Sequence, residues 1–277
     1  MSEGDEEKMK KLLRLLLVAM LICSLVAVAG CAQKEEPAPQ QQGQAPAETK
    51  KVLRVGTQAT YAPFEFVDKD SGEFVGFDMD LIRAIGKVQG YEVEIQSMGF
   101  DALIPALQTD KVDVTISAQS ITEERLKAID FSEPYFNGGL IVAVRADNND
   151  IKGYDDLAGK RLAAEVGTIG ADASEKLKEK DPKTEVRIFD NIGEAFMELE
   201  KGGADGVIND WAVTDYYMTT TGKGKIKTVG EVFQADDQYG IGVKKGNTEI
   251  LNLINDGLAK LKDSGEFDEI YKKWFSQ

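Results

Sequence analysis

The chain reads LRVGT at residues 53–57, DMDLIRAIGKV at 78–88 and YEVEIQS at 91–97. The first and third segments are short apolar or β-branched runs that predict strands, and the middle one has the period of a helix. In that helix Met79, Ile82, Ile85 and Gly86 fall on one face, which we expect to be buried. The order strand, helix, strand predicts a βαβ unit at the start of the folded part of the chain.

The same alternation continues for about 225 residues. Further strands are predicted at 112–116, 140–144, 161–164, 185–189, 206–208, 226–229 and 239–243, and the clearest further helices at 171–180, 192–201 and 248–264. A chain that alternates in this way is expected to be an α/β protein, with parallel sheets covered by helices on both faces.

The N-terminal residues have the pattern of an export signal. Residues 15–29 are apolar and follow Lys10, Lys11 and Arg14. This run is too short for a transmembrane helix and fits the core of a signal peptide spanning residues 1–30. Its acidic start suggests that translation begins at Met9.

The signal ends in VAGC at residues 28–31, which resembles a bacterial lipobox with lipid attached to Cys31. An ordinary signal peptide followed by an incidental cysteine is the alternative. Residues 31–51 hold the lipidated Cys31 and a spacer rich in Pro and Gln, which predicts a disordered tether. Because Cys23 would leave with the signal, the mature chain has no pair for a disulfide. We expect the protein on the outer face of the cell membrane or in the periplasm, held by the lipid.

Composition excludes several classes of function. The chain has 33 Lys and Arg against 48 Asp and Glu, a net charge of −15, and no His. The acidic balance disfavours nucleic-acid binding. The lack of His removes His-based general bases and His-ligated zinc.

Cofactor fingerprints are also missing: no dinucleotide, P-loop or nucleophile-elbow motif occurs, so no cofactor and no metal site is predicted. The turn GTIG at 167–170 falls between a predicted strand and a predicted helix. It could hold an anion at the helix N-terminus or be an ordinary tight turn.

Six segments together resemble the polar amino-acid branch (family 3) of the bacterial solute-binding proteins of ABC transporters, most of all the glutamine-binding proteins. They are VGTQATYAPFEF (55–66), GFDMDLIRAIG (76–86), FDALIPALQTDKVDV (100–114), SITEERLKAIDFSEPYF (120–136), DNIGEAFMELEKGGADGVIND (190–210) and IYKKWF (270–275).

The resemblance implies a type II periplasmic-binding-protein fold, with two α/β lobes joined by two crossing hinge strands. Lobe 1 would comprise 52–136 and 235–277, and lobe 2 would comprise 137–234, with crossings near 136–139 and 234–237. An amino acid would bind between the lobes and be delivered to an ABC permease and its ATPase. The family expectation is a monomer.

The resemblance also implies a ligand site. Arg125 matches the arginine that grips the α-carboxylate, with a planar fork that lysine lacks, and Asp210 matches the partner of the α-ammonium. The remaining matched residues are Tyr61 and Phe100 as aromatic walls, Ser117, Ala118 and Ser120 after a predicted strand, and Thr168 and Ile169 with backbone N–H groups. The alternatives are a solvated Arg125, an N-cap role for Asp210 and core packing for Tyr61 and Phe100.

Three positions depart from the pattern of the nearest relatives: Gln58, Glu165, and Gln89, which replaces a small or aliphatic residue at the end of the helix at 78–88. Gln58 stands where many members have an acidic residue, and its amide could read a glutamine side chain. Glu165 stands where glutamine-binding proteins often have Lys, and a carboxylate there would suit arginine or lysine. We expect glutamine on overall likeness, with basic amino acids next.

Two other functions remain open at this stage. The fold also resembles periplasmic cyclohexadienyl dehydratases, which act on prephenate or arogenate, and a buried Glu165 could serve as the acid there. The chain could also be the ligand-binding subunit of a sensing system. The intact set of Arg125, Ser120 and Asp210 favours a binding protein that is not an enzyme.

Overall fold

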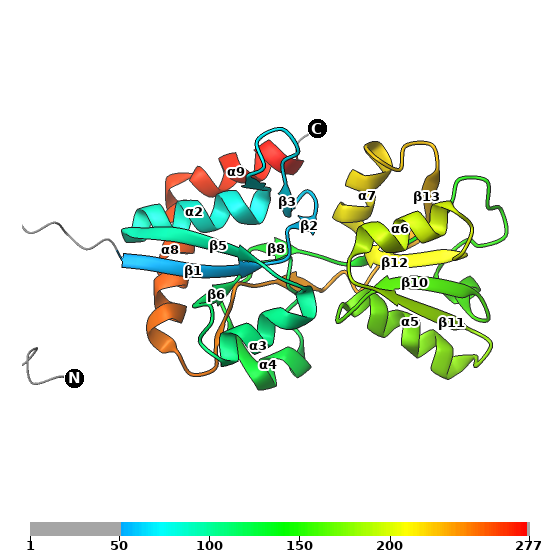
Figure 1. Ribbon diagram of the computed structural model, residues 1–277, viewed down its shortest axis with the longest axis horizontal. Helices are drawn as coiled ribbons and strands as arrows, with labels where there is room; N and C mark the ends of the chain where they lie inside the picture. The colour runs from blue at the N-terminus through cyan, green and yellow to red at the C-terminus, as the bar shows by residue number, and fades with distance from the viewer. Residues whose placement is uncertain (1–50, 276–277) are drawn as a thin grey trace, which may run out of the picture. The chain divides into compact units, whose positions relative to one another are not determined.

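The computed structural model describes residues 51–275 (Figure 1). The signal peptide, Cys31 and almost the whole tether lie outside these residues, so the lipid anchor stays a prediction. Within the described part, no helix is long and apolar enough to cross a membrane.

The first lobe is built on a five-stranded sheet in the order β5-β1-β6-β15-β7. β1 pairs in parallel with β5 along its whole length and with β6, whereas β15 runs antiparallel to β6 and β7. The strands are β1 (Lys51–Thr57), β5 (Tyr91–Ser97), β6 (Val114–Thr115), β7 (Ile129–Phe131) and β15 (Gly242–Lys244).

Helices cover both faces of this sheet. Figure 1 shows α2 and α9 on one face and α3 and α4 on the other. The helical elements are α2 (Phe77–Gln89), the 3-10 turn η1 (Phe100–Ala102), α3 (Leu103–Gln108), α4 (Glu123–Ala128), α8 (Thr248–Ser264) and α9 (Glu266–Phe275). A three-stranded sheet of β2 (Thr60–Tyr61), β3 (Glu65–Val67) and β4 (Phe74–Val75) lies between β1 and α2 in the chain.

Local sequence explains where α2 begins and what it buries. Its N-cap is Gly76, at φ 132°, and a Cβ there would lie 2.0 Å from the Phe64 carbonyl oxygen, so only glycine fits. Met79, Ile82 and Ile85 are fully buried. Gly86 lets the helix approach the strand, because a Cβ there would lie 2.4 Å from the Val93 side chain. The predicted inward face of this helix is confirmed.

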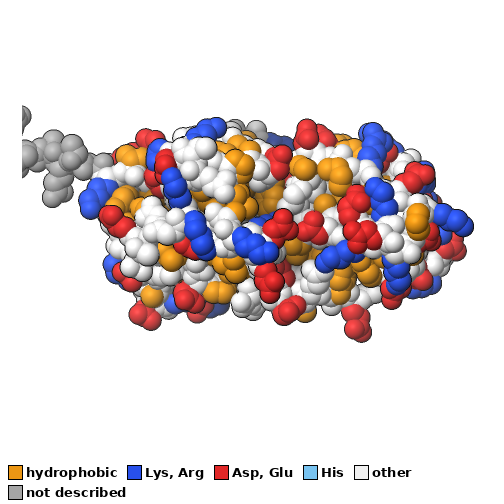
Figure 2. Space-filling view, turned by 90° about the horizontal axis from the view of Figure 1, so that it is seen from below, with side chains coloured by type: hydrophobic (Ala, Val, Ile, Leu, Met, Phe, Trp, Pro, Cys, Tyr) orange, Lys and Arg blue, Asp and Glu red, His pale blue; other side chains and the backbone are white. Residues whose placement is uncertain are grey.

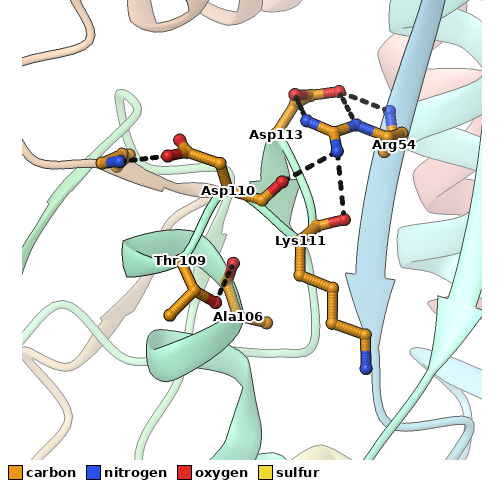
Figure 3. A network of polar contacts seen from close by, with 7 residues as sticks. Arg54, Ala106, Thr109, Asp110, Lys111 and Asp113 are labelled. Carbon is orange, nitrogen blue, oxygen red and sulfur yellow. Dashed lines mark hydrogen bonds and ion pairs between the residues drawn. The ribbon is translucent and has the colours of Figure 1, made fainter.

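A network of hydrogen bonds connects Arg54 of β1 to the turn that precedes β6 (Figure 3). The Arg54 side chain donates to both carboxylate oxygens of Asp113, at 2.5 and 3.1 Å, and to the carbonyl of Asp110 at 2.8 Å. The Arg54 backbone N–H also donates to Asp113 at 2.9 Å. This network holds in register two segments that are far apart in the sequence.

The second lobe repeats the plan with the strand order β11-β10-β12-β9-β13. β10 is parallel to β11 and β12, and β9 is antiparallel to β12 and β13. The elements are β9 (Leu140–Arg145), η2 (Tyr154–Leu157), β10 (Arg161–Glu165), α5 (Ile169–Lys180), β11 (Glu185–Phe189), α6 (Ile192–Glu200), β12 (Gly206–Asp210), α7 (Trp211–Thr219) and β13 (Ile226–Phe233).

The chain leaves the first lobe through β8 (Phe136–Asn137) and returns through β14 (Gln238–Tyr239), and these two strands pair antiparallel. β8 falls inside the first predicted crossing, and β14 directly follows the second. The division of the chain into 52–136 with 235–277 and 137–234 remains a prediction, although the strands of each sheet fall in the corresponding segments, apart from Lys51 at the start of β1.

The two-lobed α/β fold is confirmed, with two corrections. The sheets are mixed rather than parallel, because the strand that follows each crossing, β9 after β8 and β15 after β14, runs antiparallel to its neighbours. The predicted strand at 239–243 divides into β14 and β15, which pair with different partners. Gly240 lies between them, where a Cβ would press on Ile121 and Phe131 at 2.9 to 3.0 Å.

Candidate functional site

Ten residues from both lobes line one cavity with about 280 Å³ of space between the atoms. All ten belong to the set expected from the sequence. They are Tyr61, Phe100, Ser117, Ala118, Ser120 and Arg125 from the first lobe, and Glu165, Thr168, Ile169 and Asp210 from the second. Gln58, the eleventh, does not line it.

The strands explain why these residues meet. Glu165 ends β10 and Asp210 ends β12, while Ser117 follows β6. In open α/β sheets, ligands bind beyond the carboxyl ends of the strands. The cavity lies where the carboxyl ends of both sheets contribute side chains.

Arg125 lies in α4, and its guanidinium is held by backbone carbonyls of both lobes. Its Nη1 donates to the Ser120 carbonyl at 2.8 Å and its Nη2 to the Gly167 carbonyl of the other lobe at 3.0 Å. Its guanidinium lies 5.2 Å from the centre of the Phe100 ring. Among the described residues no carboxylate forms an ion pair with it. Burial lowers the pKa of Arg125 and nearby carboxylates partly restore it.

Asp210 is held by two tyrosines. The hydroxyl of Tyr61 donates to one carboxylate oxygen and the hydroxyl of Tyr239 to the other. Burial raises the pKa of Asp210, and these hydrogen bonds together with the charge of Arg125 oppose the rise. Asp210 occupies the N-cap position of α7, but its side chain makes no capping hydrogen bond. Its carboxylate therefore belongs to the cavity.

Tyr239 is a site residue that the sequence did not reveal. It is fully buried in β14, and its ring stacks on Phe136 at 5.4 Å. A buried aromatic residue in a strand is normally part of a core. Only the return of the chain through the crossing places its hydroxyl on Asp210.

Glu165 is the least satisfied polar group of the cavity. Its exposed fraction is 1%, and neither carboxylate oxygen accepts a hydrogen bond from the described part of the chain. Burial raises the pKa of Glu165 to about 8, and the nearby Gln58 side chain and Ile192 N–H offset this only in part. A buried carboxyl group without a partner is costly, and a cationic group beside it would remove the cost.

The turn before α5 can supply backbone donors. Thr168 caps the helix: its Oγ accepts from the Ala171 N–H at 3.2 Å and donates to the Glu165 carbonyl at 2.9 Å. This leaves the first N–H groups of α5 beside the cavity, at the positive end of the helix dipole. They are suited to an anionic group of a ligand.

Ser120 connects the cavity to the hinge. Its hydroxyl donates to Asp237 Oδ2 at 3.1 Å, just before β14. Burial, followed by the negative charge of Asp210, raises the pKa of Asp237 to about 6. Asp237 is a second residue near the site that the sequence did not single out.

Gln58 bonds across the lobes instead of facing the cavity. Its side-chain Nε2 donates to the carbonyl of Asp190 at 2.9 Å. The residue is buried, with 5% of its surface exposed. The structure therefore does not support the idea that Gln58 reads the ligand side chain directly.

Replacing Gln58 with alanine is expected to weaken the binding of both arginine and glutamine, and that of arginine somewhat more, because the Gln58 side chain also lowers the pKa of Glu165. One neutral hydrogen bond contributes about 0.5–1.5 kcal/mol, so the loss should be roughly two- to tenfold. Calorimetric titration with arginine and with glutamine measures it, and Gln108→Ala on the exposed surface of α3 is the control. A loss confined to glutamine would instead restore Gln58 as the reader of the side chain.

No group of three or more metal-ligating side chains occurs within residues 51–275. Figure 2 shows acidic and basic side chains mixed over one face, with no large block of either sign. The arrangement is that of a site for a small charged molecule, with a cation, two carboxylates and backbone donors facing one cavity.

The chain matches the model of the bacterial extracellular solute-binding proteins, family 3, over residues 53–277. It belongs to this family. The class implied by the sequence resemblance is thus confirmed, while a particular likeness to glutamine-binding proteins is not.

Relatives with different ligands in their names are similarly close. A probable histidine-binding protein of Neisseria gonorrhoeae is 34% identical, covering 94% of this chain and 95% of the relative. An ABC transporter glutamine-binding protein of Bacillus subtilis is 33% identical, covering 97% and 98%. An ancestral arginine-binding protein, solved with arginine and with glutamine, has a TM-score of 0.77 and 44% identity, covering 81 to 82% of this chain and 98% of that one. All are binding proteins, in agreement with the expectation that this chain is not an enzyme.

Proposed function

We propose that this protein is the binding component of an ABC importer for amino acids, and that its ligand is a cationic amino acid, with arginine the first candidate. The observation that carries the choice of ligand is the buried, unpartnered carboxyl group of Glu165 in the cavity wall. The glutamine favoured by sequence likeness becomes the second candidate.

The α-carboxylate and α-ammonium of the ligand have opposite partners available. Arg125 forms no ion pair with any carboxylate of residues 51–275, and the N-terminus of α5 adds N–H donors, so the ligand carboxylate would lie between them. Asp210, oriented by Tyr61 and Tyr239, would receive the ammonium. The rings of Tyr61 and Phe100 would flank the aliphatic part.

The charges of the cavity then favour a cationic side chain. Arg125 contributes one positive charge, and Asp210 and ionised Glu165 contribute two negative ones. A cationic amino acid carries two positive charges and one negative, so every charge finds a partner when water is excluded. A glutamine ligand would leave Glu165 without an opposite charge.

The surroundings of the cavity add to this preference. An adjoining cavity shares Phe100, Arg125 and Ile169 with the first and is also lined by three carboxylates, Asp101, Glu124 and Asp172. Acidic groups beside an entrance raise the local concentration of cations. They would favour entry of a positively charged ligand over a neutral one.

Capture would work through the ligand's contacts with both lobes. A molecule that touches Arg125 on one lobe and Asp210 on the other stabilises the form in which the lobes meet. We propose that this form is presented to a permease and its ATPase by a monomer. The lipid on Cys31 and the tether at 31–51 would keep it at the outer face of the membrane.

Proton release on binding tests the choice of ligand. With the pKa of Glu165 at about 8, the group is mostly protonated at pH 7, and a cationic ligand must displace this proton to form its ion pair. Arginine affinity should therefore rise about tenfold per pH unit below roughly pH 7.5 and level off above about pH 8. Calorimetry of ligand-stripped protein in buffers with different ionisation enthalpies counts the protons released.

Citrulline is the matched control ligand, because it has the shape of arginine with a neutral end group. Its affinity should not rise with pH in this range, and its binding should release no proton from Glu165. Equal affinities for arginine, citrulline and glutamine, without proton release by arginine, would contradict the proposal. Glutamine would then be the ligand to test next, bound to a protonated Glu165 that donates to its amide.

A further inference from the structure

Two carboxyl groups are buried together beneath the cavity. Glu65 begins β3 and Asp78 lies in the first turn of α2, and both are fully buried. Their side chains lie within hydrogen-bonding reach of each other. Among the described residues neither forms an ion pair with a lysine or arginine. The proposed binding mechanism uses neither group.

Each carboxyl group has one oxygen satisfied and one without a donor. Glu65 Oε1 accepts from the Ser117 hydroxyl at 2.8 Å. Asp78 Oδ2 accepts from the Ala118 N–H at 2.8 Å and from the Tyr135 hydroxyl at 2.9 Å. Glu65 Oε2 and Asp78 Oδ1 have no partner among the described donors. Two ionised carboxylates cannot donate to each other, whereas one proton shared by the pair satisfies both oxygens.

The pair holds a strained turn of the cavity wall. Ala118 has a φ of 44°, which is uncommon for a residue other than glycine. Ser117 and Ala118 both line the cavity. Ser117 Oγ also accepts from the Gln58 N–H at 3.0 Å, so the turn is tied on both sides. Strained backbone persists where surrounding contacts determine it.

We infer that Glu65 is kept as an uncharged carboxylic acid against the Asp78 carboxylate, and that this pair positions the Ser117–Ala118 turn for the ligand. The role in binding rests on the proposed ligand cavity. The proton on the pair does not, because it is a property of the folded chain without ligand. The shared proton and the role in ligand binding can therefore be tested, and disproved, independently of each other.

The surroundings assign the proton to Glu65. Asp78 accepts two hydrogen bonds from protein donors and Glu65 accepts one, which favours the charged form on Asp78. Burial and then the charge of Asp78 raise the pKa of Glu65 well above its usual value, whereas the pKa of Asp78 rises to about 6. The other titratable groups that face the pair are Tyr135, Tyr61 and Glu165, and none of them is a cation.

The proton is tested by comparing wild type with Glu65→Gln in ligand-free unfolding by urea. The folded pKa of Glu65 is raised, so the wild type gains stability from this group at low pH and loses it as the pH rises. Between the ordinary Glu pKa of about 4.3 and the raised pKa of folded Glu65, wild-type folding takes up a proton that the variant does not need, so the ratio of their folding constants should fall by up to about tenfold per pH unit.

Glu73→Gln, on the exposed turn before β4, removes a carboxylate of the same kind and should show no such slope. A ratio of wild type to Glu65→Gln that stays constant with pH would overturn the shared proton. This measurement uses no ligand, and its outcome is independent of the proposed function.

The positioning role is tested by rescue. Glu65→Ala removes the acceptor of the Ser117 hydroxyl and should weaken arginine binding at least about tenfold, as expected for a buried hydrogen bond left unmade. Glu65→Gln keeps an acceptor for Ser117 and a donor for Asp78, so it should recover most of that affinity. Equal affinity of the alanine variant and wild type would overturn the role. Where the alanine variant does not fold, a loss of about tenfold or more in the folded glutamine variant would do the same, because that variant keeps the acceptor for Ser117.

Discussion

Replacing Arg125 with alanine is expected to abolish ligand binding at micromolar concentrations while leaving the fold intact. Arg125 has no ion-pair partner within the described chain, and it is the cation that faces the cavity. Removing one partner of a desolvated charge pair costs about 2–5 kcal/mol, which corresponds to a loss of roughly 30- to 5000-fold in affinity. Titration calorimetry measures the loss, and circular dichroism checks the fold.

Two further variants show whether the loss depends on the charge and the planar shape of the Arg125 side chain. Arg125→Lys keeps the charge but loses the planar fork, so its affinity should lie between wild type and alanine. Lys127→Ala removes an exposed cation from the same short helix, α4, and should bind like wild type. Retained affinity in Arg125→Ala would remove the assignment of the α-carboxylate to this residue. The capping bond of α4 uses the Arg125 backbone N–H, so none of these changes disturbs the cap.

The second large effect is expected from Glu165→Gln, which should remove the preference for cationic ligands. Arginine should lose about 2–4 kcal/mol of binding free energy, because its end group would be buried without a counter-charge. Citrulline and glutamine should bind as well as before or better, since an amide can both donate and accept. The ratio of arginine to citrulline affinity, measured in the same buffer, is the decisive quantity.

Glu179→Gln on the exposed side of α5 is the matched control, because it makes the same carboxyl-to-amide replacement without touching the cavity. It separates the local pairing from the general attraction of an acidic protein for cations. If Glu165→Gln weakens arginine and citrulline by the same factor, Glu165 supports the cavity wall and does not read the side chain. The proposal of a cationic ligand would then fail while the amino-acid site itself could stand.

Much of the fold could be predicted from the sequence because its elements have clear periods. The inward face of α2 follows from the spacing of Met79, Ile82 and Ile85, and β1 and β5 are short segments rich in β-branched and apolar residues. The direction of each strand within its sheet could not be predicted from the sequence. β15 is a short segment near the end of the chain, and nothing in its own residues says that it inserts antiparallel between β6 and β7.

The candidate site could likewise be predicted from the sequence only in part. Residues that carry a motif, such as Arg125 and Asp210, could be placed from the sequence. Glu165 and Gln58 could not be ranked, because a side chain at the end of a strand can face the cavity or the other lobe. Only the structure separates them, with Glu165 in the cavity wall and Gln58 bonded to Asp190. Tyr239 was hidden because its role depends on where the returning crossing strand places its hydroxyl.

The position of β15 also sets the order in which the protein can be completed during synthesis. The five strands of the second sheet are contiguous in sequence, so that sheet has all its strands once residue 233 has emerged. The first sheet begins earlier but lacks its fourth strand until residue 244 is available. At about 5–20 residues synthesised per second, the interval between residues 233 and 244 is short. The first lobe, whose synthesis begins first, is nevertheless the last to have all its strands. A ribosome paused before residue 242 would display a sheet that ends at β6, because β7 pairs only with β15 among the described strands, and the edge of β6 would stay open to other strands.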